Sequence, residues 1–314
     1  MIQKLSYIKT RILTKILEKP IPKATDSDRK LIEKLQNNIK SQQSSAINTK
    51  EWSSFEKQVA SLITTKDPRH FLRWNIIQST MFSTNHKYTR TEYKNLKLSP
   101  KWNVWKKIIK EDFIGDPLPE IVCPKSSGNR IHHSYHLHQF EETTNTSILN
   151  YDVIFEFGGG YGSMRRVVDK LGFKGIYILF DLPVFSLLQQ YYLNTLKIQT
   201  TNFTTDQNFS SENKTYCVSN FKQLEALLNK INTTNKKRLF IATWSLSETP
   251  LELRQKVETL TKSFSAFLIA YQKEFSNINN IEYFNNMKSK KNNLLWKTWE
   301  IPHLKGNSYL IGNK

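Results

Sequence analysis

Residues 153–183 read VIFEFGGGYGSMRRVVDKLGFKGIYILFDLP and decide the fold. The apolar run 153–157 is typical of a strand that is buried on both faces of a parallel sheet, and a glycine cluster ends it. A helical stretch, a second apolar run at 175–180 and Asp181 follow. Glycines allow a sharp turn and a close approach by a ligand, and the next helix directs its free N–H groups at that loop. The stretch therefore predicts a βαβ unit that binds a nucleoside-like cofactor.

The glycine spacing separates two classes of cofactor site. A dinucleotide site requires G-x-G-x-x-G/A, but Ser163 or Arg165 occupies the third position here, depending on which glycine starts the count. Glu156 stands before the loop, where it would repel a pyrophosphate but suits a ligand with an ammonium or sulfonium charge. Asp181 ends the second strand, where both classes place a carboxylate on the ribose hydroxyls. The pattern E-x-G-x-G-x-G, which ends at Gly162, is that of S-adenosylmethionine-dependent methyltransferases; another Rossmann-type ligand is the alternative.

The same residues carry a family resemblance. The segments EFGGGYGSM (156–164), FDLPVFSLLQQYYL (180–193), WSLSE (244–248) and GNSYLIG (306–312) resemble the sugar O-methyltransferase family. Val184 departs from that family, in which an acidic residue often follows D-L-P. The resemblance implies an α/β, Rossmann-like class I methyltransferase fold, a seven-stranded sheet with helices on both faces. It also implies S-adenosylmethionine as cofactor and a hydroxyl of a sugar or glycan as acceptor, whether nucleotide-linked, lipid-linked or in a polysaccharide.

The carboxyl ends of the later strands complete the predicted cofactor site, because open α/β sheets bind ligands there. The residue after the third strand, at 215–219, usually flanks the adenine, so Asn220 is expected to contact it and Phe221 to stack on it. For Phe221 the alternative is a core position at the start of a helix. Thr243, near the end of the fourth strand, faces the same crevice. The predicted cofactor-binding residues are Glu156, Gly158, Gly159, Gly160, Tyr161, Gly162, Asp181, Leu182, Asn220, Phe221 and Thr243.

A base that removes the acceptor proton is expected to come from outside this unit. Plant-type O-methyltransferases carry His-Asp-Trp at the end of the fourth strand, whereas this chain has Ala-Thr-Trp at 242–244. The segment 126–138, SSGNRIHHSYHLH, holds four of the seven histidines, and imidazole has a pKa suited to proton removal. We predict His133, His136 or Glu248 as the catalytic base, with a packing or surface role as the alternative for each histidine. No H-E-x-x-H spacing occurs, and no metal site is predicted.

Two regions are predicted along the chain. Residues 1–145 read as a mainly helical N-terminal cap, and residues 146–314 as the methyltransferase domain. Within the cap, residues 1–19 form a basic amphipathic pattern, which suits either peripheral contact with a membrane or packing on the protein itself. A hairpin expected at 296–311 would supply the last two strands of the sheet.

Composition narrows the function less than the motifs do. The net charge of +19 suits anionic partners such as nucleic acid, but it also fits a general excess of lysine. RNA methylation is one alternative function, although neither a base-handling [DNS]-P-P-[YF] motif nor an RNA-binding module is present, and no nucleic-acid partner is expected. A small non-sugar acceptor is the other alternative. Cys123 and Cys217 have neither metal-site nor disulfide spacing, and no apolar stretch is long enough to span a bilayer, so a cytoplasmic enzyme is expected.

Overall fold

The computed structural model describes residues 15–16, 20–41, 50–83, 86–201, 213–232 and 235–314. The basic amphipathic helix predicted at 1–19 lies almost wholly outside the described residues. Within the described ranges, none of the helices combines the length and hydropathy that crossing a membrane requires.

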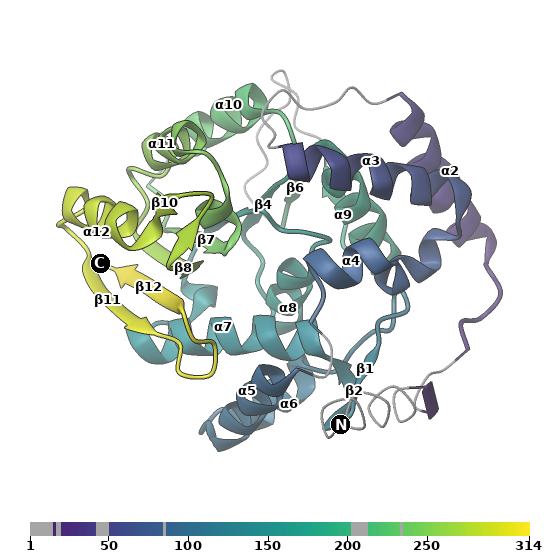
Figure 1. The fold of residues 1–314 in the computed structure, drawn as a ribbon, viewed down its shortest axis with the longest axis horizontal. Helices are drawn as coiled ribbons and strands as arrows, with labels where there is room; N and C mark the ends of the chain where they lie inside the picture. The colour runs from purple at the N-terminus through teal and green to yellow at the C-terminus, as the bar shows by residue number, and fades with distance from the viewer. Residues whose placement is uncertain (1–14, 17–19, 42–49, 84–85, 202–212, 233–234) are drawn as a thin grey trace.

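An eight-stranded mixed sheet runs through the middle of the protein (Figure 1). Its strands, in spatial order, are β11 (Leu295–Glu300), β12 (Asn307–Asn313), β8 (Ala266–Gln272), β7 (Arg238–Thr243), β3 (Val153–Phe157), β4 (Ile176–Phe180), β6 (Thr215–Val218) and β5 (Thr200–Thr201). The central strand β3 pairs in parallel with β4 on one side and β7 on the other. The chain therefore reverses its direction of travel across the sheet between β3 and β7, which makes this the switch point where open α/β sheets bind ligands.

The last two strands form the predicted hairpin. β12 runs antiparallel to β8, and β11 runs antiparallel to β12. The prediction of seven strands was short by one, because the two-residue β5 adds a parallel edge strand beside β6. A strand of two residues in a polar segment gives no recognisable pattern in the sequence. A small hairpin outside the main sheet joins β9 (Glu274–Phe275) to β10 (Ile278–Asn279).

Helices cover both faces of the sheet, as predicted for the α/β class. On one side lie α7 (Gly128–Thr144), α8 (Ser163–Leu171) and α9 (Pro183–Thr195); on the other lie α10 (Phe221–Asn232), α11 (Leu251–Leu260) and α12 (Asn280–Lys290). Successive residues of β3 serve the two layers, because Ile154 packs with the first set of helices and Phe155 with the second. Phe284 and Met287 anchor α12 in the second core.

The N-terminal region is mainly helical, as predicted, and it shares a core with the sheet. Its elements are α2 (Asp26–Lys40), α3 (Lys50–Thr65), η1 (Pro68–Arg73), α4 (Asn75–Thr80), α5 (Lys87–Leu98), α6 (Trp102–Ile108), β1 (Pro119–Glu120), β2 (Cys123–Ser127) and α7, and η2 (Ile148–Asn150) then leads into β3. Phe71 of η1 packs edge-on against Tyr161 and Tyr192, at ring-centroid distances of 5.5 and 6.0 Å. Aromatic contacts of this kind hold the N-terminal helices against the glycine loop and α9.

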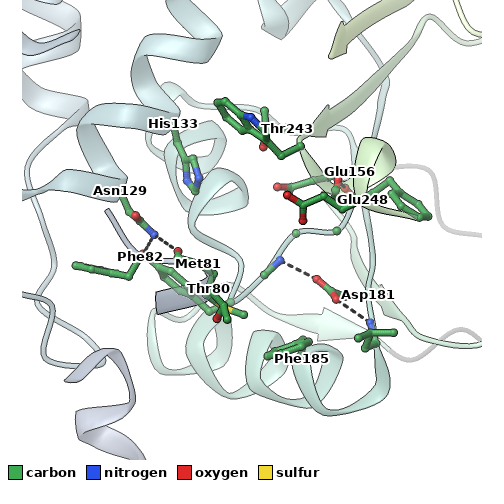
Figure 2. A pocket seen from close by; sticks show the side chains of 18 of the residues that line it. Thr80, Met81, Phe82, Asn129, His133, Glu156, Asp181, Phe185, Thr243 and Glu248 are labelled. Carbon is green, nitrogen blue, oxygen red and sulfur yellow. Dashed lines mark hydrogen bonds between the residues drawn. The ribbon is translucent and has the colours of Figure 1, made fainter. Parts of the chain in front are cut away.

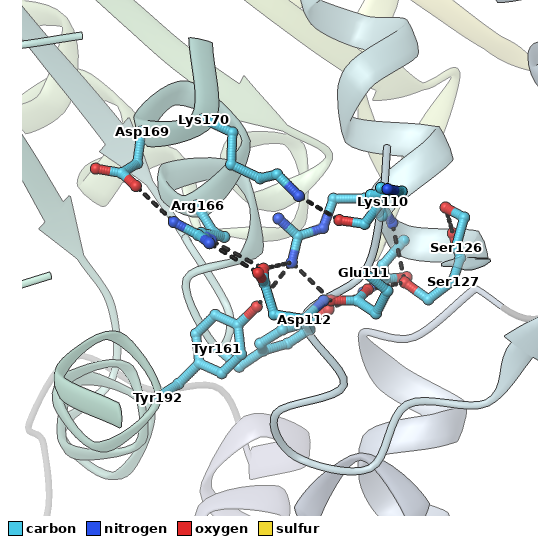
Figure 3. A network of polar contacts seen from close by, with 12 residues as sticks. Lys110, Glu111, Asp112, Ser126, Ser127, Tyr161, Arg166, Asp169, Lys170 and Tyr192 are labelled. Carbon is cyan, nitrogen blue, oxygen red and sulfur yellow. Dashed lines mark hydrogen bonds and ion pairs between the residues drawn. The ribbon is translucent and has the colours of Figure 1, made fainter. Parts of the chain in front are cut away.

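A buried ionic network joins the N-terminal region to the sheet's helices (Figure 3). Arg130 of α7 is completely buried, and its Nη2 donates to Glu111 Oε1 at 2.7 Å and to the Tyr192 hydroxyl at 3.1 Å. Arg166 of α8 donates through Nε and Nη2 to the two oxygens of Asp112, at 2.9 and 2.7 Å. Such paired geometry offsets part of the cost of removing the charges from water. The network fixes α7, and with it the histidine-rich segment, relative to α8 and α9.

Replacing Arg130 with methionine should strongly destabilise the protein. The Glu111 carboxylate, with its side chain 3% exposed, would keep its burial and lose its cation, which typically costs about 3–5 kcal/mol. Urea unfolding of Arg130→Met and wild type measures this difference. Lys256→Ala, which breaks an exposed pair with Glu252, is the control and should change stability by less than about 0.5 kcal/mol. Equal losses in the two variants would contradict this account of the network.

Candidate active site

A cavity of about 650 Å³ lies at the carboxyl ends of β3, β4 and β7. Its walls come from the glycine loop after β3, the end of β4, the turn after β7, α7, and the segment around α4. Figure 2 shows His133 and Glu248 projecting into this space from different walls, with Asp181 and Phe185 below. The volume falls in the usual range for small-ligand sites, and the position is the switch point described above.

The glycine loop is shaped by its backbone. Gly158 and Gly160 have φ values of +72° and +55°, a region that residues with a Cβ rarely adopt. A Cβ at Gly158 would lie 2.2 Å from the Cβ of Ser245, so the loop packs directly on the turn after β7. Both glycines line the cavity together with Gly159 and Tyr161. Gly162, predicted as a cofactor contact, is not among the lining residues; it is the N-cap of α8.

Two predicted carboxylates lie at the ends of neighbouring strands. Glu156 Oε2 accepts a hydrogen bond of 2.7 Å from the Tyr177 hydroxyl. Asp181 accepts from the backbone N–H groups of Gly160 and Leu182, each at 2.7 Å. Burial raises the pKa of both Glu156 and Asp181 to about 7, and in each case it outweighs the hydrogen bonds that favour the charged form. A bound cation would therefore relieve an electrostatic cost that the folded protein carries.

Glu248 adds a third carboxyl from another wall. It ends η3 (Ser245–Glu248), the turn after β7, and burial raises its pKa to about 7. Thr243 and Leu182, both predicted cofactor contacts, also line the cavity. Among the described lining residues there is no lysine or arginine, although the whole chain carries a net charge of +19. The cavity thus has the opposite electrostatic character to the chain as a whole, and it suits neutral or cationic ligands.

Asn220 and Phe221, which were predicted to flank a cofactor, are not among the residues that line the cavity, so their contact with a cofactor stays a prediction. The Asn220 Oδ1 atom accepts from the backbone N–H groups of Lys222 and Gln223, which makes Asn220 the cap of α10. Phe221 packs edge-on against Phe180 at 6.0 Å. Ser219, one residue earlier in the chain, lines the cavity in their place.

The two predicted histidines have different surroundings. His133 lines the cavity, and burial followed by the charges of His132 and Arg130 lowers its pKa to about 3, so its ring is neutral at neutral pH. His136 is completely buried and does not line the cavity; its Nδ1 lies 2.5 Å from the Tyr309 hydroxyl. α7 turns His136 toward β12 and away from the cavity, and a role for it as a base stays a prediction.

Sequence reasoning missed a third histidine and its carboxylate partner. His132 lines the cavity, and its Nδ1 lies 2.8 and 2.9 Å from the two oxygens of Glu92 on α5. The histidine cluster was a signal for His132, but nothing in the sequence linked it to a glutamate forty positions earlier. Trp244 was also missed; it lines the cavity and stacks on His132 with ring centroids 5.5 Å apart. Its φ of +64° is rare for a bulky residue and is the kind of strain that gathers at functional sites.

The chain is similar to solved structures of known proteins. No family model matches the chain, and no curated protein matches it. PigF, solved with SAH, shares 12% identity over 99% of this chain and 97% of its own, with a TM-score of 0.37. An O-methyltransferase family protein from Burkholderia thailandensis shares 9% identity over 100% and 98%, also with a TM-score of 0.37. Magnesium protoporphyrin IX methyltransferase (ChlM) from Synechocystis PCC 6803, with bound SAM, shares 11% over 72% and 97%, with a TM-score of 0.38.

The fold class rests on the sheet of the chain itself. Five main parallel strands run in the order β6-β4-β3-β7-β8, and the antiparallel β12 is inserted between β8 and the edge strand β11. A purely parallel doubly wound sheet lacks such an inserted strand. The chain therefore has the Rossmann-like class I methyltransferase fold, with one short strand added at the β6 edge.

The ligand-free protein should lose stability as pH rises, and Glu248→Gln should reduce that loss. The unfolded Glu248 ionises near its ordinary pKa of 4.5, whereas in the folded chain its pKa is about 7. The stability that this proton contributes is present below pH 4.5 and is lost as pH rises through 7. Thermal unfolding between about pH 5 and pH 8 should therefore give a flatter dependence of Tm in Glu248→Gln.

The control for this experiment is Glu252→Gln. Glu252 lies close by in the sequence, on the exposed side of α11, where a hydrogen bond from Lys256 lowers its pKa. Its variant should keep the wild-type dependence of Tm on pH. A Glu248→Gln profile parallel to wild type would show that the carboxyl ionises normally in the folded chain.

Proposed function

We propose that the protein is an S-adenosylmethionine-dependent O-methyltransferase that acts on a hydroxyl of a sugar or glycan. The observation that carries the proposal is the cavity at the switch point of the sheet, where Glu156, Asp181 and Glu248 face a space without lysine or arginine among its described lining residues. A ligand with a ribose and a positive charge fits this arrangement. The sugar as acceptor rests on the family resemblance of the segments at 156–164 and 180–193.

The residues present fit the cofactor. Asp181 Oδ2 accepts from the Gly160 N–H and from Gln189 Nε2, whereas Oδ1 accepts from the Leu182 N–H, so Oδ1 retains a lone pair for a ribose hydroxyl. Glu156 engages Tyr177 through Oε2 only, and the raised pKa of Glu156 marks a carboxyl that a nearby cation would stabilise in its charged form. Leu182 and Phe180 provide an apolar shelf beside Asp181 for a planar base. The glycines of the loop complete this wall of the cavity with backbone atoms and no side chains.

When bound, S-adenosylmethionine would supply an activated methyl group, so the protein has to position an acceptor oxygen and remove one proton. Trp244, Tyr88 and Phe82 present rings to the cavity, and His132, His133 and Asn129 present polar edges. This mixture suits a sugar, which has apolar ring faces and hydroxyls around its rim. A phosphate-bearing acceptor such as RNA would find no lysine or arginine among the described lining residues.

S-adenosylmethionine should bind to the purified protein, and Asp181→Ala should weaken binding by about tenfold to a hundredfold. The variant removes hydrogen bonds to a charged group, each worth about 1.5–3 kcal/mol. Isothermal titration calorimetry measures both affinities. Asp26→Ala alters an exposed aspartate at the start of α2 and should bind like wild type. Binding of NAD in preference to S-adenosylmethionine would overturn the assignment of the cofactor.

Cells that lack the gene should lose a methylated glycan. Mass spectrometry of surface glycans from cells with and without the gene should show the disappearance of a species heavier by one methylene unit, because O-methylation replaces a hydroxyl hydrogen with a methyl group. Re-expression of the wild-type chain should restore the species, and re-expression of Asp181→Ala should restore it poorly. Unchanged glycans together with altered RNA methylation would replace the sugar proposal with the nucleic-acid alternative.

A further inference from the structure

His132 and Glu92 form a buried histidine–carboxylate pair at the cavity wall. Glu92 is completely buried on α5, and both of its oxygens lie within hydrogen-bond distance of His132 Nδ1. His303, in the turn before β12, approaches the same carboxylate with Nε2 at 3.1 Å. Burial opposes ionisation of Glu92, but its interactions with His132 and His303 outweigh burial and lower the pKa of Glu92. The glutamate is therefore held as a carboxylate between two imidazoles.

The carboxylate determines which nitrogen of His132 carries the proton. A carboxylate only accepts hydrogen bonds, so His132 Nδ1 must be the donor. In the neutral ring this leaves a lone pair on Nε2, the atom at the far edge of the imidazole. A histidine oriented by a carboxylate in this way is the usual arrangement for a general base.

Aromatic neighbours hold the ring of His132 in place. Trp244 stacks on it at 5.5 Å with an interplanar angle of 23°, Tyr88 lies at 5.3 Å, and His136 packs edge-on at 4.1 Å. The titratable groups around His132 come from three parts of the chain. Glu92 and Tyr88 lie on α5 and His86 just before it, His133 and His136 lie on α7, and His303 lies in the turn before β12. Burial lowers the pKa of His86, His133 and His136, so these three rings stay neutral at neutral pH.

The other histidines of α7 lack one part of this arrangement. His133 reaches the cavity, but its Nδ1 is buried with no hydrogen-bond partner in the described residues. His136 has the Tyr309 hydroxyl beside Nδ1, but it is not among the residues that line the cavity. His138 has Glu142 at 3.8 Å and also lies away from the cavity. Within the described chain, His132 alone among them combines access to the cavity with a carboxylate partner.

We propose that His132, oriented by Glu92, is the general base of the methyl transfer, an inference that rests on the proposed function. The acceptor hydroxyl gives its proton to His132 Nε2 while its oxygen forms a bond to the methyl carbon. The carbon–sulfur bond of the sulfonium breaks, and its electron pair stays on sulfur, which becomes a neutral thioether. The positive charge thus passes to the imidazolium of His132, where the Glu92 carboxylate stabilises it.

Kinetics of three variants test the role of His132. His132→Asn keeps an N–H donor for Glu92 near the position of Nδ1 but removes Nε2. Glu92→Gln removes the charge of the carboxylate. His138→Asn, on the same helix as His132, is the control. The assay measures S-adenosylhomocysteine release with S-adenosylmethionine and the glycan fraction from cells lacking the gene. For His132→Asn, kcat should fall by about 10²–10⁴ while the KM for S-adenosylmethionine stays constant. Wild-type kcat should fall at acidic pH, where a general base is protonated, and His132→Asn should not show this fall. Glu92→Gln should show a smaller loss of kcat.

A structural role for His132 would give a different pattern. It would lower Tm and raise the KM for S-adenosylmethionine, and the shape of the pH profile would not change. An active His132→Asn with the wild-type pH profile overturns the inference and leaves the proposed function intact. Loss of activity in His138→Asn equal to that in His132→Asn also overturns it.

Nuclear magnetic resonance provides a test that does not depend on turnover. In protein labelled with ¹⁵N-histidine, long-range nitrogen–proton spectra identify the tautomer of each ring, and the His132→Asn spectrum assigns its signals. His132 should carry its proton on Nδ1 in its neutral form, and Glu92→Gln should shift this resonance while His138 keeps its own. A neutral His132 that carries its proton on Nε2 overturns the inference, whether or not the glycan fraction is methylated. If the tautomer is as expected but the glycan fraction is not methylated, the result counts against the proposed acceptor alone.

Discussion

The desolvation of Glu156 at the end of the central strand is the constraint on which the site depends. β3 is buried by helices on both faces, so its last residues cannot reach bulk water. A carboxyl in this position is costly when it is charged, and its raised pKa records that cost. In the fold, Glu156 accepts one hydrogen bond from Tyr177. Further stabilisation of the charged carboxylate would have to come from a bound ligand. The same topology places Asp181 at the end of the neighbouring strand, so a single cavity faces both carboxyls.

The N-terminal region supplies what the sheet lacks. The end of β7 carries no histidine, and the histidines near the cavity come from α7 and from the residue before α5. α7 is positioned by Arg130, which is buried against Glu111 and Tyr192, and not by an amphipathic pattern, because most of its residues are buried on all sides. The carboxylates and the histidines of the cavity thus come from different parts of the chain, which share one hydrophobic core. The N-terminal helices therefore pack into the same hydrophobic core as the sheet.

Local sequence patterns were sufficient for the fold, and they also brought Glu156 and Asp181 to the same cavity. The strand, loop and acid at 153–181 are contiguous, and the chemistry of Glu156, Gly158 and Asp181 follows from their order along the chain. Ser219 lines the cavity, whereas the side chain of the next residue, Asn220, caps α10. The surroundings of the histidines could not be predicted in the same way. A helical period groups His132 with His136, but it does not say which of the two faces the cavity, and the pairing of His132 with Glu92 depends on how α5 packs against α7.

The contrast between the chain and its cavity bears on the choice of acceptor. A net charge of +19 by itself favours an anionic partner, and long-range attraction of such a partner toward the surface is a real physical effect. Chemistry, however, depends on the groups within a few ångströms of the reacting atoms, where fields are least screened. There the described residues present carboxyls, imidazoles and aromatic rings. An acceptor that carries phosphate can be drawn to the outer surface by charge, but the part that enters the cavity is best an uncharged hydroxyl, which is what a base at His132 would act on.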